Sequence, residues 1–177
     1  MEPHEKQELL DWLERGRRTF CEAVAGVSEA DAARASGPGR WSVLECAEHV
    51  SLVEEYLFDR LLEGRPDPDA AIPPQREALI RARAADRARK VPAPEAAVPQ
   101  GRYRTLPEAL AAFGAARDRT MAYVAACEED LRAKVTTHPI LKAVTCHETL
   151  FMMAAHPERH AKQVAEIRDS WGLASPI

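Results

Sequence analysis

Two histidines set four residues apart near the end of the chain are the residues best placed to do chemistry. His156 and His160 belong to a segment with helical periodicity, and at about 100° per residue both fall on its apolar stripe. Side chains at positions i and i+4 lie about 5–6 Å apart, so both imidazoles can reach one ion at Zn–N distances of roughly 2.0–2.1 Å. The alternative is two buried structural histidines, with Thr149 and Gln163 as the nearest hydrogen-bond partners. We favour the metal site, because each ring would otherwise need its own partner on an apolar stripe.

A third ligand is available in His49, which lies beside the apolar stripe of an earlier helical segment. Three protein ligands and an open fourth position are typical of catalytic zinc, whereas structural zinc is usually closed by four ligands. The cysteines are too widely spaced to close the site as a pair, at Cys21, Cys46, Cys127 and Cys146. Imidazole suits several divalent metals, so we expect a divalent ion, with Zn or Ni ahead of Mn or Fe.

Four amphipathic segments are expected to position these histidines as helices. Three of them open with a capping box, in which a Ser or Thr is followed three residues later by Glu. The boxes are Ser42 with Glu45, Thr105 with Glu108 and Thr145 with Glu148. The expected helices cover roughly residues 3–26, 42–63, 105–129 and 145–171, and no segment shows strand patterning. The predicted fold class is therefore all-α, a four-helix bundle with one long crossover connection.

The predicted crossover is residues 64–104, which hold more than half of the 13 prolines. Within it, residues 76–90 are rich in Ala and Arg and could form one short exposed helix. We expect this helix to be solvated, with a cover over the mouth of the site as the alternative. The crossover has too few large apolar residues for a core of its own, so we expect it to bury little surface. We therefore predict a single domain spanning residues 1–177.

The composition argues against several functional classes. The net charge is −4, and no run of Lys and Arg is interleaved with aromatic residues, so nucleic acid is not an expected partner. No apolar stretch approaches the ~18 residues of a membrane span. The first twenty residues carry acidic side chains where a signal peptide needs an apolar segment. We therefore expect a cytoplasmic protein whose thiols are reduced and mostly buried.

Two motifs resemble the DinB/YfiT-like family. Trp41-Ser-Val-Leu-Glu-Cys-Ala-Glu-His49 is similar to the start of the second helix in that family, and His156-x-x-x-His160-x-x-Gln163 to the motif of its fourth helix. The histidines that anchor them stand 107 residues apart, and the likeness covers nearly the whole chain. The resemblance implies a four-helix bundle, often dimeric, that binds a divalent metal through three histidines. Pro157 departs from regular helical geometry inside the second motif, because proline lacks an N–H and disfavours a helical conformation at the preceding residue.

The resemblance also implies an activity. The family includes S-transferases that use the low-molecular-weight thiols bacillithiol or mycothiol, and other members are described as metal-dependent hydrolases. We therefore expect a metal-dependent enzyme that transfers a small thiol to an electrophilic small molecule. A metal-dependent hydrolase and a non-catalytic metal-binding stress-response module are the alternatives, and a plain bundle with buried histidines is a third. Gln163 and Tyr56 are expected to line the cofactor pocket, no catalytic acid or base is identified, and a homodimer is a further expectation.

Other polar residues near these motifs are expected to be structural. His147 lies roughly 100° away from the apolar stripe, which predicts an exposed or interfacial side chain. His138 precedes Pro139 in a predicted loop. Glu148 is one of the charged residues of the last helix that are expected to point away from the core. Cys46 faces the buried side of its helix and is expected to be an inert thiol.

Overall fold

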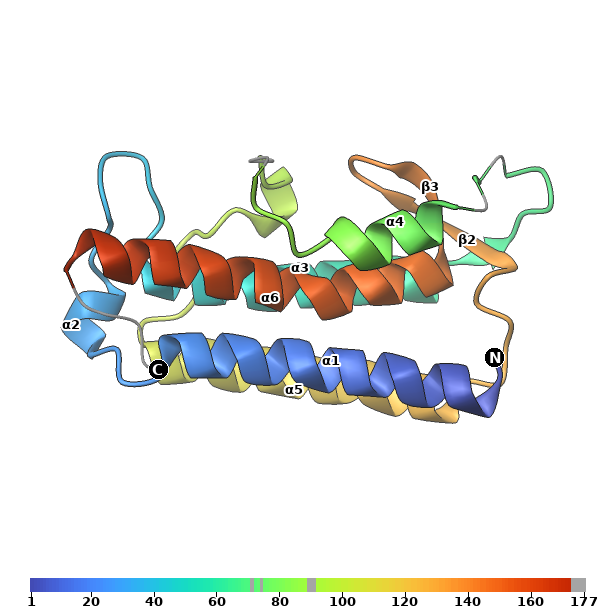
Figure 1. Ribbon diagram of the computed structural model, residues 1–177, viewed down its shortest axis with the longest axis horizontal. Helices are drawn as coiled ribbons and strands as arrows, with labels where there is room; N and C mark the ends of the chain where they lie inside the picture. The colour runs from blue at the N-terminus through green and yellow to red at the C-terminus, as the bar shows by residue number, and fades with distance from the viewer. Residues whose placement is uncertain (71, 74, 89–91, 173–177) are drawn as a thin grey trace.

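Four long helices form the body of the molecule (Figure 1). They are α1 (Pro3–Val24), α3 (Val43–Leu62), α5 (Leu106–Ala126) and α6 (Cys146–Ser170). The computed structural model describes residues 1–70, 72–73, 75–88 and 92–172. In Figure 1, α3 and α6 lie above α1 and α5, and the long connection between α3 and α5 passes over the upper pair. The predicted four-helix bundle with one long crossover is therefore confirmed.

The three predicted capping boxes start helices where expected. The Ser42 hydroxyl accepts a hydrogen bond from the backbone N–H of Glu45 at 3.1 Å, and the Glu45 carboxylate accepts one from the N–H of Ser42 at 2.7 Å. The boxes at the starts of α5 and α6 have the same reciprocal form. Capping fixes the first turn of a helix, so it also fixes the direction in which later side chains of α3 and α6 point.

A small sheet corrects the prediction that strands are absent. It contains β1 (Arg65–Pro66), β2 (Lys134–His138) and β3 (Lys142–Thr145), paired antiparallel in the order β1-β2-β3. The β-branched run Val135, Thr136 and Thr137 favours an extended backbone, but five residues are too few for a clear alternating pattern. Thr136 donates a hydrogen bond to the carbonyl of Arg60 at 2.7 Å, which attaches the sheet to the end of α3. The sheet covers one end of the bundle and adds no layer to its core.

The crossover is more ordered and more deeply packed than its composition suggests. It contains the short helix α4 (Arg76–Arg83), which packs on α6, and the 3-10 turn η1 (Glu95–Ala97), which packs on α3. The helix predicted over residues 76–90 ends at Arg83, and residues 89 and 90 lie outside the described residues. Ile80 is 8% exposed and Ala97 is 0% exposed, so the expectation that the crossover buries little surface is wrong for these two positions.

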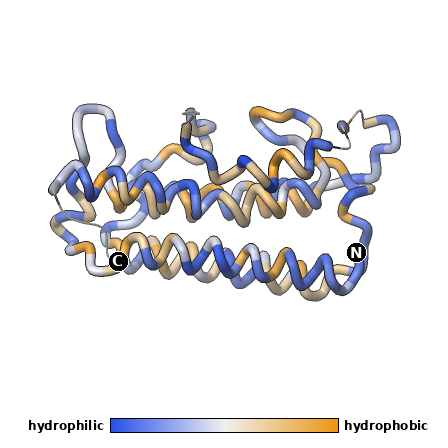
Figure 2. The backbone as a smooth tube through the Cα atoms, in the orientation of Figure 1, coloured by the Kyte–Doolittle hydropathy of each residue, from blue (hydrophilic) through white to orange (hydrophobic). Residues whose placement is uncertain are grey.

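The helices are amphipathic, with hydrophobic and hydrophilic residues alternating along each of them (Figure 2). Their buried apolar side chains form two clusters, one including Leu13, Leu57 and Phe151 and the other Phe20, Val50 and Phe113. Among the described residues, no helix combines the length and the apolar character that a membrane span requires. The two clusters meet at a polar layer in the middle of the bundle.

This polar layer is an ion pair whose arginine touches all four helices. Arg117 of α5 is 0% exposed and donates to both carboxylate oxygens of Glu54 of α3, at 2.9 and 2.8 Å. The same guanidinium donates to the carbonyl of Leu13 of α1 at 2.5 Å and to the carbonyl of Met153 of α6 at 2.8 Å. Because a buried charge without a partner is costly, this arrangement strongly favours one placement of the four helices relative to one another.

Candidate metal centre

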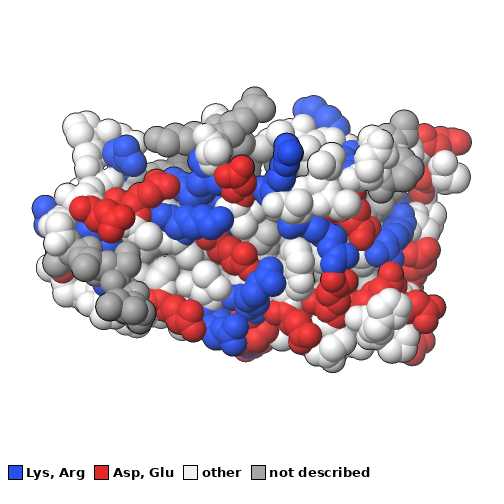
Figure 3. Space-filling view, viewed as in Figure 1, with Lys and Arg blue, Asp and Glu red and all other residues white. Residues whose placement is uncertain are grey.

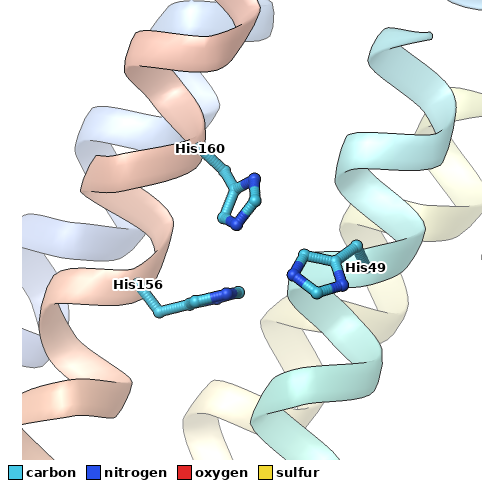
Figure 4. A group of neighbouring side chains, drawn as sticks. All are labelled: His49, His156 and His160. Atoms are coloured by element: carbon cyan, nitrogen blue, oxygen red, sulfur yellow. The ribbon is translucent and has the colours of Figure 1, made fainter. Parts of the chain in front are cut away.

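The structure brings together the three histidines singled out by the sequence. His49 of α3 and His156 and His160 of α6 each offer one ligand atom, and these atoms all lie within 4.8 Å of one another. The ring centroids are 5.0 Å apart for His49 and His156, 4.6 Å for His49 and His160, and 4.4 Å for His156 and His160. Figure 4 shows the rings pointing toward one another across the gap between the two helices. Such a group could hold a metal ion.

His49 is held in one orientation by the crossover. Its Nδ1 lies 2.6 Å from the carbonyl oxygen of Ala97 in η1, 48 residues further along the chain. Because a carbonyl only accepts, Nδ1 must carry the proton, and the lone pair of the neutral ring is then on Nε2. A hydrogen bond of this kind on the far side of the ring is typical of metal-binding histidines. The sequence could not reveal this contact, because nothing in it indicates which crossover residue reaches α3.

The arrangement of the three rings supports the same interpretation. Figure 4 shows one nitrogen of each of the three rings aimed at the space between them. A neutral imidazole has a single N–H, so three rings facing one another leave lone pairs without donors, at a cost of about 1–3 kcal/mol for each unsatisfied group. A cation in that space would satisfy them together.

The surroundings of the cluster keep its imidazoles neutral. Burial lowers the pKa of His49, although the hydrogen bond to Ala97 opposes the shift. Burial also lowers the pKa of His156 and of His160 well below the usual value, and the neighbouring histidines and the cations Arg87 and Arg159 lower it further. Neutral imidazole is the form that binds a metal, so the cluster does not have to lose protons near neutral pH before it can act as a ligand set.

Pro157 lies inside the motif without ending α6, which continues to Ser170. Proline has no N–H, so the carbonyl of Met153, four residues earlier, loses its partner within the helix. Arg117 donates to that carbonyl at 2.8 Å. Helices α1 and α6 also approach closely beside this carbonyl. A Cβ on Gly16 of α1 would lie only 2.2 Å from the carbonyl oxygen of Ala154 of α6, so only glycine permits this approach. The polar layer of the core therefore compensates for the proline between the two histidines.

The cluster forms part of the wall of a cavity of about 980 Å³. Both residues predicted to line the pocket, Tyr56 and Gln163, lie on its wall. Gln163 accepts a hydrogen bond from Arg87 at 2.8 Å through its side-chain oxygen, so its amide nitrogen remains as the donor. α4 contributes Ile80 to the wall, so this helix borders the site and is not only the solvated helix that its composition favours. Trp41 also lines the cavity and packs against His49, with the two ring centroids 4.7 Å apart.

Two predictions about α6 are wrong. His147 is 1% exposed instead of exposed or interfacial, and its Nδ1 lies 3.0 Å from a carboxylate oxygen of Glu77. Glu148 is also 1% exposed instead of pointing away from the core, because Arg76 donates two hydrogen bonds to its carboxylate at 2.9 and 2.7 Å. Both partners belong to α4. The periodicity of α6 places His147 and Glu148 on its outward side, but α4 of the crossover packs over that side.

The remaining sequence candidates lie outside the three-histidine cluster. His138 is the last residue of β2 and also lines the cavity, and its Nδ1 accepts hydrogen bonds from the backbone N–H groups of Ile140 and Leu141 at 3.2 Å each. Cys46 is 0% exposed, and burial raises the pKa of its thiol to about 12. A thiol with that pKa is protonated at neutral pH and is a poor nucleophile, as expected for a structural cysteine.

The chain is similar to known proteins in sequence and in fold. A sequence model of the DinB superfamily matches residues 12–164. Among solved structures, the chain is similar to YfiT from Bacillus subtilis, described as "a probable metal-dependent hydrolase with an unusual four-helix bundle topology". The two share 14% sequence identity with a TM-score of 0.60, and the match covers 98% of this chain and 91% of that one. No curated protein matches the chain significantly. At this level of identity the structural likeness concerns the fold alone.

Proposed function

Since this chain belongs to the DinB superfamily, we propose that it is a metal-dependent enzyme whose divalent ion is bound by His49, His156 and His160. The observation that carries the proposal is the convergence of three neutral imidazoles on one point at the wall of a cavity. We expect zinc or nickel, with manganese or iron as alternatives, because imidazole binds several divalent metals. When bound, the ion supplies Lewis acidity that favours the deprotonated form of a thiol or water at the open position.

We propose that the reaction is transfer of a low-molecular-weight thiol to an electrophilic small molecule. The cavity, at about 980 Å³, has room for two small reactants. Asp86 is the single carboxylate that lines it among the described residues, so a carboxylate base for water is poorly represented. A free thiol has a pKa of about 8.5 and water one of about 15.7, so a thiol needs much less assistance to become a nucleophile.

The residues around the cluster would bind and orient the reactants. Gln163 presents its amide nitrogen as a donor because Arg87 occupies its oxygen. Tyr56 lies on the same wall, and Trp41 packs against His49 and would shield that ring from solvent. Hydrolysis is the second candidate reaction, supported by the description of YfiT as a probable metal-dependent hydrolase. A metal-binding module without turnover is the third.

The first test compares these reactions directly. Protein loaded with zinc or nickel is mixed with monochlorobimane as the electrophile and with bacillithiol, mycothiol or cysteine as the thiol, and thioether formation is followed by fluorescence. We expect the loaded wild type to accelerate transfer and His156→Ala to lose that acceleration by a factor on the order of 10². His138→Ala is the matched control, because His138 lines the same cavity outside the cluster.

The other reactions predict different results. Hydrolysis of p-nitrophenyl acetate that depends on the metal, without thiol transfer, would replace the transferase proposal by a hydrolase. Stoichiometric metal with neither activity would indicate the non-catalytic module.

A further inference from the structure

The charged side chains that line the cavity are strongly unequal in sign. The positive ones are Arg40, Arg76, Arg83, Arg87 and Arg159, whereas Asp86 is the single acidic residue on the wall among the described residues. The whole chain has the opposite balance, with a net charge of −4. On the outer surface that carries α4 and α6 both signs are interspersed (Figure 3). The excess of arginine therefore belongs to the cavity and is not a property of the protein as a whole.

Two of these arginines are fixed in place by carboxylates that lie behind the wall. Arg76 donates one hydrogen bond to each carboxylate oxygen of Glu148. Arg87 donates to both carboxylate oxygens of Glu166, at 3.0 Å each. Neither of these carboxylates lines the cavity. Arg83, at the end of α4, makes no ion pair with the described residues. The wall thus combines two arginines that are hydrogen-bonded to carboxylates outside it with Arg83, which makes no such pair.

The arginines are close to the three histidines. Arg159 lies between His156 and His160 in the sequence of α6, and Arg87 is hydrogen-bonded to Gln163, less than one turn beyond His160. A divalent ion would add two further positive charges to the same cavity. Like charges gathered in a partly enclosed space repel one another strongly, so a bound ligand that carries negative charge would be favoured there. The planar fork of a guanidinium matches a carboxylate particularly well.

We propose that Arg83, Arg87 and Arg159 form a carboxylate-binding subsite beside the three histidines, and that the substrate is a small organic acid. This inference rests on the proposed function, because it places the reactive end of that acid at the metal position. The arginines would hold the carboxylate and thereby orient the other end of the molecule toward His49, His156 and His160. The subsite selects the class of substrate, and the histidine cluster determines where it reacts.

The test measures how much a carboxylate contributes to binding next to the metal. Protein is loaded with Co²⁺, whose near-ultraviolet absorption reports a coordinated thiolate, and titrated with 3-mercaptopropionate or with its neutral amide, 3-mercaptopropionamide. We expect the acid to bind the wild type about tenfold more tightly than the amide, or more, as for a hydrogen bond to a charged group. In Arg83→Gln and Arg159→Gln this preference should fall toward one, while the affinity for the amide stays the same.

Two further variants separate charge from folding. Arg159→Lys keeps the positive charge and should retain part of the preference, which would show that a loss in Arg159→Gln is electrostatic. Arg18→Gln is the matched control, because the Arg18 side chain is 66% exposed on α1 and is not part of the cavity wall. Circular dichroism of each variant checks that the helices persist.

The outcomes distinguish the two proposals. Equal affinity of the wild type for acid and amide, with the thiolate absorption present for both, would overturn the carboxylate subsite and leave the metal–thiol proposal intact. No thiolate absorption with either probe, in protein that has bound Co²⁺, would overturn the thiol-transfer proposal and the subsite with it.

Discussion

Arg117→Ala is expected to lower the free energy of unfolding by about 3–5 kcal/mol, the usual cost of removing one partner of a buried ion pair. The substitution leaves the Glu54 carboxylate, 2% exposed, without its cation, and it leaves the carbonyl of Met153 without a donor. Urea denaturation followed by circular dichroism measures the change. Arg18→Ala is the control, since an exposed pair such as Arg18 with Glu22 contributes about 0–1 kcal/mol.

A second substitution tests the link between Arg117 and the histidine motif. Pro157→Ala restores an N–H at position 157, which can bond the carbonyl of Met153 within α6. In the Pro157→Ala protein, Arg117→Ala should therefore lower the free energy of unfolding by about 1 kcal/mol less than it does in the wild type. The difference is the hydrogen bond from Arg117 to Met153, which the new N–H replaces. Additive effects of the two substitutions would show that Arg117 does not compensate for the proline.

Replacing any one histidine of the cluster should nearly abolish metal binding. In His49→Ala, His156→Ala or His160→Ala the ion keeps two imidazole ligands instead of three, too few for a stable protein site. Elemental analysis of untagged protein after loading and dialysis should give about one ion per chain for the wild type and close to zero for each variant. The bundle should persist, because the apolar contacts of both core clusters are untouched.

Two other histidines serve as controls for these variants. His138→Ala and His147→Ala should keep their metal, because neither side chain belongs to the group whose ligand atoms converge. Equal metal content in the wild type and in His156→Ala would contradict the assignment of the site.

The sequence predicted the parts of this structure that depend on local patterns. Apolar residues with helical spacing and three capping boxes were sufficient to predict the four helices. The same periodicity placed His156 and His160 on the inward side of α6, and the structure brings His49 to them. The helices and the inward pair on α6 could be predicted because they depend on residues within one or two turns of each other, whereas the approach of His49 depends on the packing of α3 against α6.

The features that the sequence did not predict depend on contacts made across the fold. His147 and Glu148 are outward by the periodicity of α6, and they are buried because α4 from the crossover packs over them. The hydrogen bond from His49 to Ala97 has the same origin. One signal was present in the sequence: Arg117 is four residues after Phe113 and interrupts the apolar stripe of α5, which marks a charge that must find a partner in the core.

Several expectations stay predictions. They are the metal and substrate roles of the histidines, Gln163 and Tyr56, the single domain over residues 1–177, the homodimer and the cytoplasmic location.

X-ray absorption at the zinc K-edge measures whether three imidazoles bind the ion and leave one position open. The sample is the wild type reconstituted with one equivalent of zinc, with His156→Ala prepared in the same way. We expect about three imidazole nitrogens and one further light ligand at roughly 2.0–2.1 Å in the wild type, and on addition of a thiol one Zn–S distance near 2.3 Å that replaces the light ligand. A wild-type spectrum without imidazole scattering, or one identical to that of His156→Ala, would contradict the account.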